Sequence, residues 1–293
     1  MIEVAHFTDP GCPWAYSAAP AHTSLRWRYG DGLRWTLVTI GLTEDSAQYA
    51  ARGYRPTRSA INWRTTFARF GMPFAFTPKA GLSATSPGCR AIVATRLDAP
   101  EHEMAAFRAL QFAQFTTTGR LEDPAMLRGA LKSVAGLDGD AIVARIGDAD
   151  VLAAYEADRA RARTAAGSPT EFQGRSANTD GAVRYTAPSL VFESGGRSLE
   201  AGGFQPIEAY DVVVANLDPT LARRSPATDP VDVLAAFPYP LASAEVAAAM
   251  TPHLEAPDLL AAETALIAAV GDGRAVRAAA GNSSLWSLAG ANG

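Results

Sequence analysis

The chain has 293 residues, of which 48% are hydrophobic and 19% are charged, and its formal net charge at pH 7 is −4. A chain of this length can bury one large core or two modest ones, so the composition is typical of an ordinary globular protein. The acidic balance gives nucleic acids and anionic membranes no electrostatic reason to bind, and we expect neither as a partner. Neither a signal peptide nor an apolar run of roughly 18 residues is visible, which favours a cytoplasmic protein.

The beginning of the chain has a β-α-β pattern. Residues 2–8 and 33–41 are rich in β-forming side chains, and the stretch 14–27 between them has helical spacing. This order predicts two parallel strands joined by a helix. At the junction of the first strand and the helix lies the run Asp9-Pro10-Gly11-Cys12-Pro13-Trp14-Ala15-Tyr16.

Cys12 is the first candidate for chemistry. A thiol at the N-terminus of a helix meets the positive end of the helix dipole and unpaired N–H groups, and both favour the thiolate. We therefore expect a nucleophile whose pKa is lowered from about 8.5 to roughly 3.5–7.5, the alternative being a small buried apolar residue. Pro13 suits the first helical position because it has no N–H to lose there.

The centre of the chain has a different character. From about residue 43 to residue 181 it is rich in Ala, Leu and Arg with helical spacing, which predicts a large helical insertion. Strand signals then return on both sides of Gly195-Gly196, and they predict a hairpin followed by a last helix. The helices expected in the insertion are at residues 91–97, 104–115, 124–135, 140–146 and 151–164, and the later strands and helix are at 189–193, 197–201 and 206–217.

The run around Cys12 and a second block resemble the DsbA-like branch of the thioredoxin superfamily, which includes FrnE-type proteins, 2-hydroxychromene-2-carboxylate isomerases and kappa-class glutathione transferases. The second block is similar to the family's cis-proline loop. It reads Tyr185-Thr186-Ala187-Pro188-Ser189-Leu190-Val191-Phe192. The resemblance covers about residues 1–217 and implies an α/β, thioredoxin-like fold with the helical insertion at 43–181. It further implies a cis Ala187-Pro188 peptide beside Cys12.

Residues 218–293 form a second predicted unit. Three short helical patterns, at 231–237, 243–250 and 257–270, precede two strand-like pieces at 274–278 and 284–288. Three helices and a hairpin resemble a small α+β winged-helix domain. This unit has four basic and eight acidic side chains, so DNA binding is excluded. We expect a role in homodimerisation or in covering the active-site cleft, with passive packing as the alternative.

Ala15 limits the reactions open to Cys12. It stands where a redox pair would carry its second cysteine, and dithiol exchange requires a resolving thiol. Cys89 is the only other cysteine, and either it resolves a mixed disulfide or it is a buried helical residue. The four histidines are scattered without ligand spacing, so no metal site is predicted.

Two aromatic residues after Cys12 are further candidates. Tyr16 either donates its hydroxyl to a substrate oxygen as a catalytic residue or packs in the core, and Trp14 forms a pocket wall or core. From the resemblance we expect substrate contacts in the cis-proline loop, at Thr186, Ala187 and Pro188.

Two cations are candidates for binding a carboxylate or a carbonyl. They are Arg90, in the insertion, and Arg175, in a polar stretch at residues 170–180 whose length suggests a mobile flap. The alternative for each is a solvated surface charge.

Three functions remain open. The leading hypothesis is cis-trans isomerisation of a small unsaturated carbonyl compound through reversible addition of the Cys12 thiolate, which requires no cofactor. The second is thiol-disulfide exchange or a transferase reaction with a low-molecular-weight thiol such as glutathione or mycothiol. The third is a non-catalytic adaptor that keeps the fold as a docking surface.

Overall fold

A mixed four-stranded sheet forms the centre of the computed structural model, which describes residues 1–290. Strands β1 and β2 are parallel, whereas β5 runs antiparallel to β1 and β6 antiparallel to β5. The predicted α/β class and the parallel opening pair are confirmed. The sheet has the order β2-β1-β5-β6, with β1 at Ile2–Thr8, β2 at Leu33–Thr39, β5 at Ser189–Ser194 and β6 at Arg197–Ala201.

The central strand β1 is buried on both faces, as expected for a strand covered by helices on either side. Side chains alternate between the two faces, so Ile2 and Val4 pack in a cluster with residues of α2 (Ala19–Tyr29) and α11 (Ile207–Leu217). Phe7 points the other way and packs in the cluster that contains Cys12. The turn that contains Cys12 therefore begins directly after β1.

The helix predicted at residues 14–27 is divided into α1 (Pro13–Ser17) and α2. The division falls at Ala18, just before Pro20. A proline has no N–H to donate to the carbonyl one turn earlier, so a continuous ladder of hydrogen bonds is broken there. Helix α1 is consequently only five residues long.

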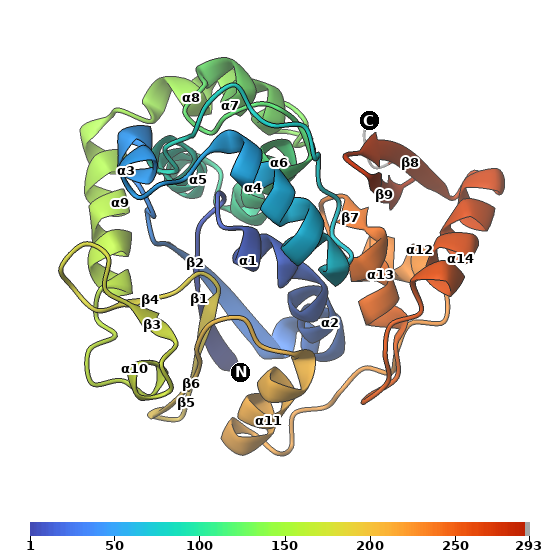
Figure 1. Ribbon diagram of the computed structural model, residues 1–293. Helices are drawn as coiled ribbons and strands as arrows, with labels where there is room; N and C mark the ends of the chain where they lie inside the picture. The colour runs from blue at the N-terminus through green and yellow to red at the C-terminus, as the bar shows by residue number, and fades with distance from the viewer. Residues whose placement is uncertain (291–293) are drawn as a thin grey trace.

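Each helix predicted in the insertion is present, with its ends shifted by a few residues. The insertion surrounds the top and left of the sheet in Figure 1, whereas the C-terminal elements lie at the right. Three short helices in this region were not predicted, because four to seven residues are too few for a clear hydrophobic period. The helices are α3 (Ser46–Ala51), α4 (Pro56–Asn62), α5 (Ser86–Asp98), α6 (Glu103–Thr116), α7 (Pro124–Leu131), α8 (Gly139–Arg145), α9 (Ala149–Ala162) and α10 (Pro169–Phe172).

The polar stretch at residues 170–180 is partly structured. It begins within α10, and β3 (Ser176–Ala177) pairs with β4 (Arg184–Tyr185). The stretch is therefore tied to the segment that enters the cis-proline loop, and its mobility stays a prediction.

The helices and the hairpin predicted after residue 217 are also present. The added strand β7 has only two residues and was not predicted. The sheet here has the order β7-β9-β8. The elements are α12 (Pro230–Ala235), β7 (Leu241–Ala242), α13 (Ser243–Met250), α14 (Leu259–Gly271), β8 (Ala275–Ala280) and β9 (Ser283–Leu288).

A buried polar cluster joins this C-terminal segment to the rest of the protein. Glu245, on α13, accepts hydrogen bonds from Thr23 of α2 at 2.9 Å and from Arg108 of α6 at 2.6 Å. Arg108 and Glu245 are almost completely buried. Residues 291–293 lie outside the described residues, and the boundary at 217/218, the winged-helix comparison and homodimerisation stay predictions. No helix among residues 1–290 has both the length and the apolar character needed to cross a membrane.

Candidate functional site

The turn after β1 places Cys12 beside the cis-proline loop, residues 186–188. The backbone N–H of Cys12 donates to the carbonyl of Asp9 at 3.1 Å, which closes the turn and positions the residue at the N-terminus of α1. Its Sγ donates to the carbonyl oxygen of Ala187 at 3.1 Å. The Ala187-Pro188 peptide is cis, as the resemblance implied. Two segments separated by more than 170 residues thus meet at one sulfur atom.

The thiol of Cys12 is held in its neutral form, which corrects the expected thiolate. The residue is only 7% exposed, and burial raises the pKa of its thiol to about 12. The backbone N–H of Ala15 lowers this pKa, but the carboxylate of Asp9 raises it. A helix of five residues aligns few peptide dipoles, so it cannot offset the loss of hydration.

Asp9 is the most important residue at this turn that the sequence reasoning did not assign. It is completely buried, and its Oδ1 accepts from the backbone N–H of Gly11 at 2.8 Å. Its Oδ2 accepts from the N–H of Leu42 at 2.9 Å, from Thr85 Oγ1 at 2.9 Å and from Cys89 Sγ at 3.5 Å. Burial raises the pKa of this carboxyl, and the hydrogen bonds oppose that rise. Asp9 therefore joins the Cys12 turn to the loop after β2 and to the start of α5.

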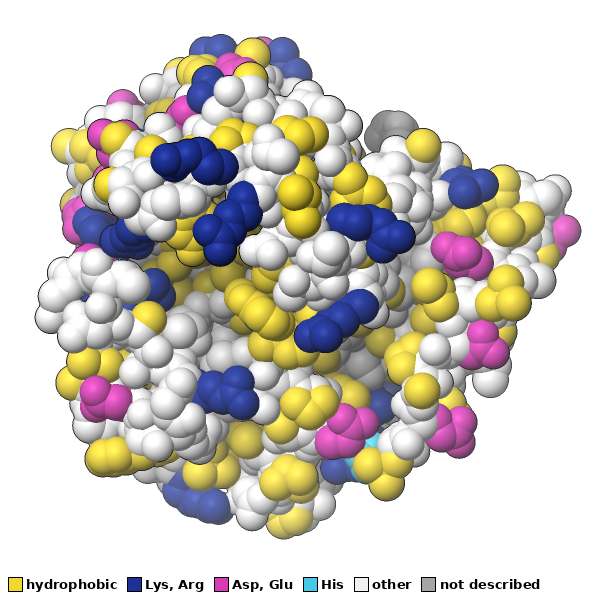
Figure 2. Space-filling model, in the orientation of Figure 1, with side chains coloured by type: hydrophobic (Ala, Val, Ile, Leu, Met, Phe, Trp, Pro, Cys, Tyr) yellow, Lys and Arg dark blue, Asp and Glu magenta, His cyan; other side chains and the backbone are white. Residues whose placement is uncertain are grey.

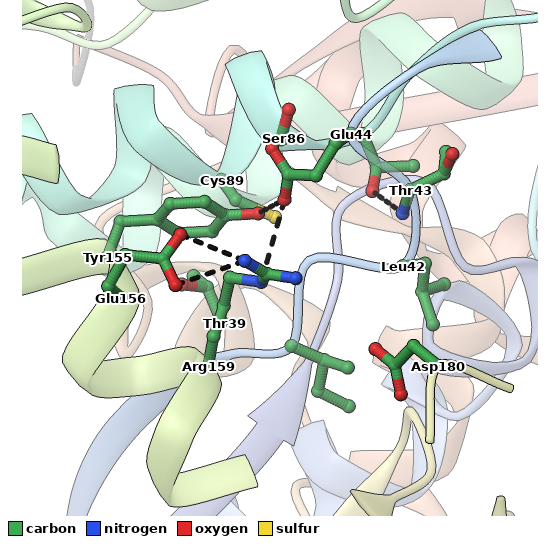
Figure 3. Close-up of polar contacts among 12 residues, drawn as sticks. Thr39, Leu42, Thr43, Glu44, Ser86, Cys89, Tyr155, Glu156, Arg159 and Asp180 are labelled. Atoms are coloured by element: carbon green, nitrogen blue, oxygen red, sulfur yellow. Dashed lines mark hydrogen bonds and ion pairs between the residues drawn. The ribbon is translucent and has the colours of Figure 1, made fainter. Parts of the chain in front are cut away.

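Cys89 is a buried helical residue. It has no exposed surface, and burial together with the nearby Asp9 carboxylate raises the pKa of its thiol. Figure 3 shows the polar network around it, in which Tyr155 donates to Glu44 at 2.6 Å and Arg159 forms an ion pair with Glu44 at 3.5 Å. Both cysteines are free thiols. The structure therefore opposes a resolving role for Cys89.

A cavity of about 580 Å³ lies beside Cys12. The volume is within the range of sites that hold drug-sized molecules. Trp14 forms part of the wall and is 40% exposed, with its ring 4.8 Å from that of Phe67. Tyr54 and Trp63 extend this aromatic wall. We call this space the thiol cavity.

Cations surround the thiol cavity. Figure 2 shows dark blue Lys and Arg side chains around a hollow that has hydrophobic side chains on its floor. No aspartate or glutamate of the described chain lines this space. The lining cations, called the cavity cations below, are Arg52, Arg55, Arg58, Lys79 and Arg184.

The distribution of charges along the sequence could have predicted these cations. Between Asp45 and Asp98 there is no acidic residue. The same interval carries eight basic side chains, although the chain as a whole is acidic. Such a bias in one segment predicts an anion-binding surface, and it would have directed attention to α3 and α4.

Tyr16 does not face the thiol cavity. It is completely buried, its hydroxyl donates to the carbonyl of Pro73 at 2.9 Å, and its ring stacks on Phe115 with centroids 4.6 Å apart. The expected role as a hydrogen-bond donor to substrate is therefore corrected to a packing role. The local sequence could not show this, because Pro73 and Phe115 come from distant parts of the chain.

Arg90 and Arg175 are not part of the cavity wall either. The Nε of Arg90 donates to the carbonyl of Ser86 within its own helix, at 3.4 Å. The exposed Arg175 contributes its backbone carbonyl, which accepts from Thr186 Oγ1 at 2.7 Å. The expected role of both arginines in binding substrate is therefore corrected to the alternative, a surface charge. Thr186 stabilises the cis-proline loop and does not line the cavity. Across residues 1–290, no three His, Cys, Asp or Glu side chains are grouped so that they could hold a metal ion.

The chain is similar to known proteins in its fold. No protein-family model matches the sequence, and no curated protein matches it. Among solved structures, a proposed protein disulfide isomerase from Nitrosomonas europaea matches with a TM-score of 0.53 and 22% identity, over 73% of this chain and 96% of its own.

Two further solved structures are similar. The cytosolic disulfide reductase DsbM from Pseudomonas aeruginosa has a TM-score of 0.50 and 18% identity, over 74% of this chain and 100% of its own. A probable DsbA oxidoreductase from Streptomyces coelicolor has a TM-score of 0.50 and 17% identity, over 78% of this chain and 93% of its own. At these identities the likeness concerns the fold, and the chain has an α/β fold of the DsbA-like thioredoxin type.

Proposed function

We propose that the protein is a thiol-disulfide oxidoreductase that uses one cysteine and a low-molecular-weight thiol. The observation that carries this proposal is the position of Cys12, which contacts the cis-proline loop through its Sγ and lines a cavity large enough for a small molecule. Cys89 is closed off, so the second thiol of each cycle has to come from outside the chain. The names given to the similar solved structures, a disulfide reductase among them, agree with this chemistry.

The reaction has two exchange steps. In the first, Cys12 Sγ forms a bond to one sulfur of a disulfide, the S–S bond breaks, and the leaving sulfur takes the electron pair and the proton that Cys12 gives up. In the second, the low-molecular-weight thiol attacks the outer sulfur of the mixed disulfide and leaves joined to it in a new disulfide, while the Cys12 sulfur takes the electron pair and the proton of the attacking thiol. Atoms and electrons balance, because one disulfide is reduced for each one formed.

The neutral resting thiol has a consequence for this cycle. The thiolate is the attacking species, so the proton on Sγ must leave before exchange. The hydrogen bond to the Ala187 carbonyl holds that proton in place. A ligand that enters beside the cis-proline loop and competes for this carbonyl would release the thiol for reaction.

The test is an intact-mass measurement with glutathione disulfide. We expect the native protein to gain one glutathionyl group and to lose it again when glutathione is added. The Cys12→Ser variant should gain none, and its turnover of a small disulfide with glutathione should fall at least a hundredfold, since it lacks the nucleophile. Cys89→Ser should behave as the unchanged protein does. Full activity of Cys12→Ser in cells would instead favour the adaptor.

Isomerisation remains a second candidate because the thiol cavity has an aromatic wall next to Cys12, formed by Trp14, Trp63 and Phe67. Such a wall suits a conjugated, unsaturated carbonyl compound. Thiolate addition would make the double bond rotatable, and expulsion of the thiolate would return the other geometric isomer. Incubation with a cis-enone carboxylic acid, followed by NMR, separates the candidates: recovery of the trans isomer without loss of thiol supports isomerisation, and unchanged substrate excludes it for that compound.

A further inference from the structure

The segment that forms one side of the thiol cavity has an exceptional charge. Residues 46–97 carry eight basic and no acidic side chains. Four of these cations, on or after α3 and α4, line the cavity, and Arg184 joins them from β4. Charges of one sign in a partly enclosed space produce a field that attracts ligands of the opposite sign.

The cavity cations lack carboxylate partners in the described chain. Arg52 and Arg184 donate instead to the backbone carbonyl and the hydroxyl of Thr179, at 3.2 and 3.3 Å. Arg55 donates to backbone carbonyls near its own position. The exposed side chain of Arg58 has no hydrogen bond or ion pair with any residue of 1–290. The guanidinium groups are thus positioned by neutral oxygens, and the carboxylates of Asp180 and Asp9 act on Arg184 only from beyond ion-pair distance.

Two of these cations are buried. Lys79 is 9% exposed and donates to the carbonyls of Thr117 and Gly119, so one of its three N–H donors remains. Arg184 is 7% exposed, and burial lowers the pKa of its guanidinium. Burial also lowers the pKa of Lys79, to about 8. A buried charge without a counter-ion is costly, and a bound anion would offset this cost.

The buried arginines outside the cavity have carboxylate partners. Arg28 pairs with Asp211, and Arg108 pairs with Glu245 at 2.6 Å. The half-buried Arg26 lies over the Trp35 ring instead. The cavity differs in that five cations line one space and no aspartate or glutamate of the described chain lines it, which is the arrangement expected where a ligand supplies the negative charge.

We propose that the thiol cavity binds a small organic molecule that carries at least two anionic groups, carboxylate or phosphate, and presents its sulfur to Cys12. This inference rests on the proposed function for the reaction and on the cavity cations for the ligand class. Arg184, whose charge acts on Cys12, holds the anionic group nearer the sulfur, whereas the exposed Arg52, Arg55 and Arg58 hold the distal one at the mouth. Lys79 adds a further positive charge to the wall beside Trp63. The Trp14 and Trp63 rings contact the part between them.

The first test compares three disulfides of similar size and different charge: 3,3′-dithiodipropionate, bis(2-hydroxyethyl) disulfide and cystamine, which are dianionic, neutral and dicationic. The readout is the half-saturating concentration for mixed-disulfide formation on Cys12, with rates normalised to those of the unfolded chain. We expect the dianion to saturate at a concentration at least tenfold lower than the neutral compound. Equal values for the three compounds would overturn the anion site and leave the proposed function standing.

Matched variants locate the effect. The double variant Arg55→Ala/Arg58→Ala should raise the half-saturating concentration of the dianion about tenfold without changing the limiting rate, because both guanidinium groups are exposed and removed from the sulfur. The double variant Arg64→Ala/Arg69→Ala removes an equal charge from the following helical segments, outside the cavity wall, and should change neither value. An equal effect of both double variants would show that only overall charge matters and would overturn the assignment of these residues.

Binding can also be measured without the reaction. In the Cys12→Ser variant, titration with 3,3′-dithiodipropionate should change the fluorescence of Trp14 and Trp63, which line the cavity. Saturable binding by this variant, with no mixed disulfide on the unchanged protein, would retain the anion site and reject the proposed function. No saturable binding of the dianion would reject the anion site whatever the reactivity of Cys12.

Discussion

Cys12 and Cys89 both form a hydrogen bond with Asp9, but their surroundings differ. Asp9 binds the turn that carries Cys12 through its backbone carbonyl and binds the Cys89 thiol through Oδ2. Burial raises the pKa of both thiols. Only Cys12 lies in a cavity wall, while Cys89 is enclosed by α5 and the network around Tyr155. The two cysteines thus differ in whether a molecule in the thiol cavity can reach them, and burial raises the thiol pKa of both.

This difference teaches how a thioredoxin-like site can work with one thiol. A dithiol enzyme brings its second sulfur to the first one, whereas here the second sulfur is held by a buried acid away from the cavity. The open space beside Cys12 is lined by cations instead. In the exchange that we propose, the partner thiol therefore arrives from solution and carries its own negative charges.

The largest expected effect is a difference in alkylation. Iodoacetamide at pH 9 should modify Cys12 of the native protein at least a hundred times faster than Cys89, because only Cys12 borders a cavity. Intact-mass measurements should show one adduct in native protein and two in denaturant. The native Cys12→Ser variant should show none. Comparable labelling of both cysteines in native protein would contradict the comparison.

A second expectation concerns pH. The folded-state pKa of Cys12, about 12, lies above the ordinary value of a cysteine, so the thiolate fraction at any lower pH is smaller in the folded than in the unfolded chain. The alkylation rate of native Cys12 should therefore rise about tenfold for each pH unit between pH 7 and pH 10. The same measurement in denaturant should reach a plateau near pH 9 to 10. A native plateau below pH 9 would show that the thiol is activated.

The smallest expected effect belongs to Asp9. Its carboxylate raises the pKa of both cysteines, so Asp9→Asn should speed the alkylation of Cys12 at pH 8 by roughly three- to tenfold. The asparagine amide cannot replace every acceptor, and a loss of about 1–3 kcal/mol in unfolding free energy should accompany the change. Asp45→Asn, at the exposed start of α3, is the control and should leave the rate unchanged. A slower rate in folded Asp9→Asn would contradict the electrostatic role.

Much of this architecture could be predicted from the sequence because its signals are local. The strand β1, the hairpin of β5 and β6 and helix α13 follow from side-chain period and turn residues. The meeting of Cys12 with Ala187 was predicted from the family resemblance of two motifs.

The rest depends on packing between distant segments. The hydroxyl of Tyr16 is satisfied by Pro73, and the acidity of Cys12 is set by burial, neither of which a short motif records. The cavity cations were missed although their charge bias is visible in the sequence, because the short helices α3 and α4 that carry several of them have no clear period.

The ion pair between Arg108 and Glu245 has a consequence for how the protein is made. The chain leaves the ribosome from its N-terminus, so Arg108 of α6 is synthesised well before Glu245 of α13. A buried guanidinium without its carboxylate is strongly unfavourable, and α6 cannot close over this position until the later segment arrives. The buried junction of α2, α6 and α13 is then completed only after nearly the whole chain has been synthesised.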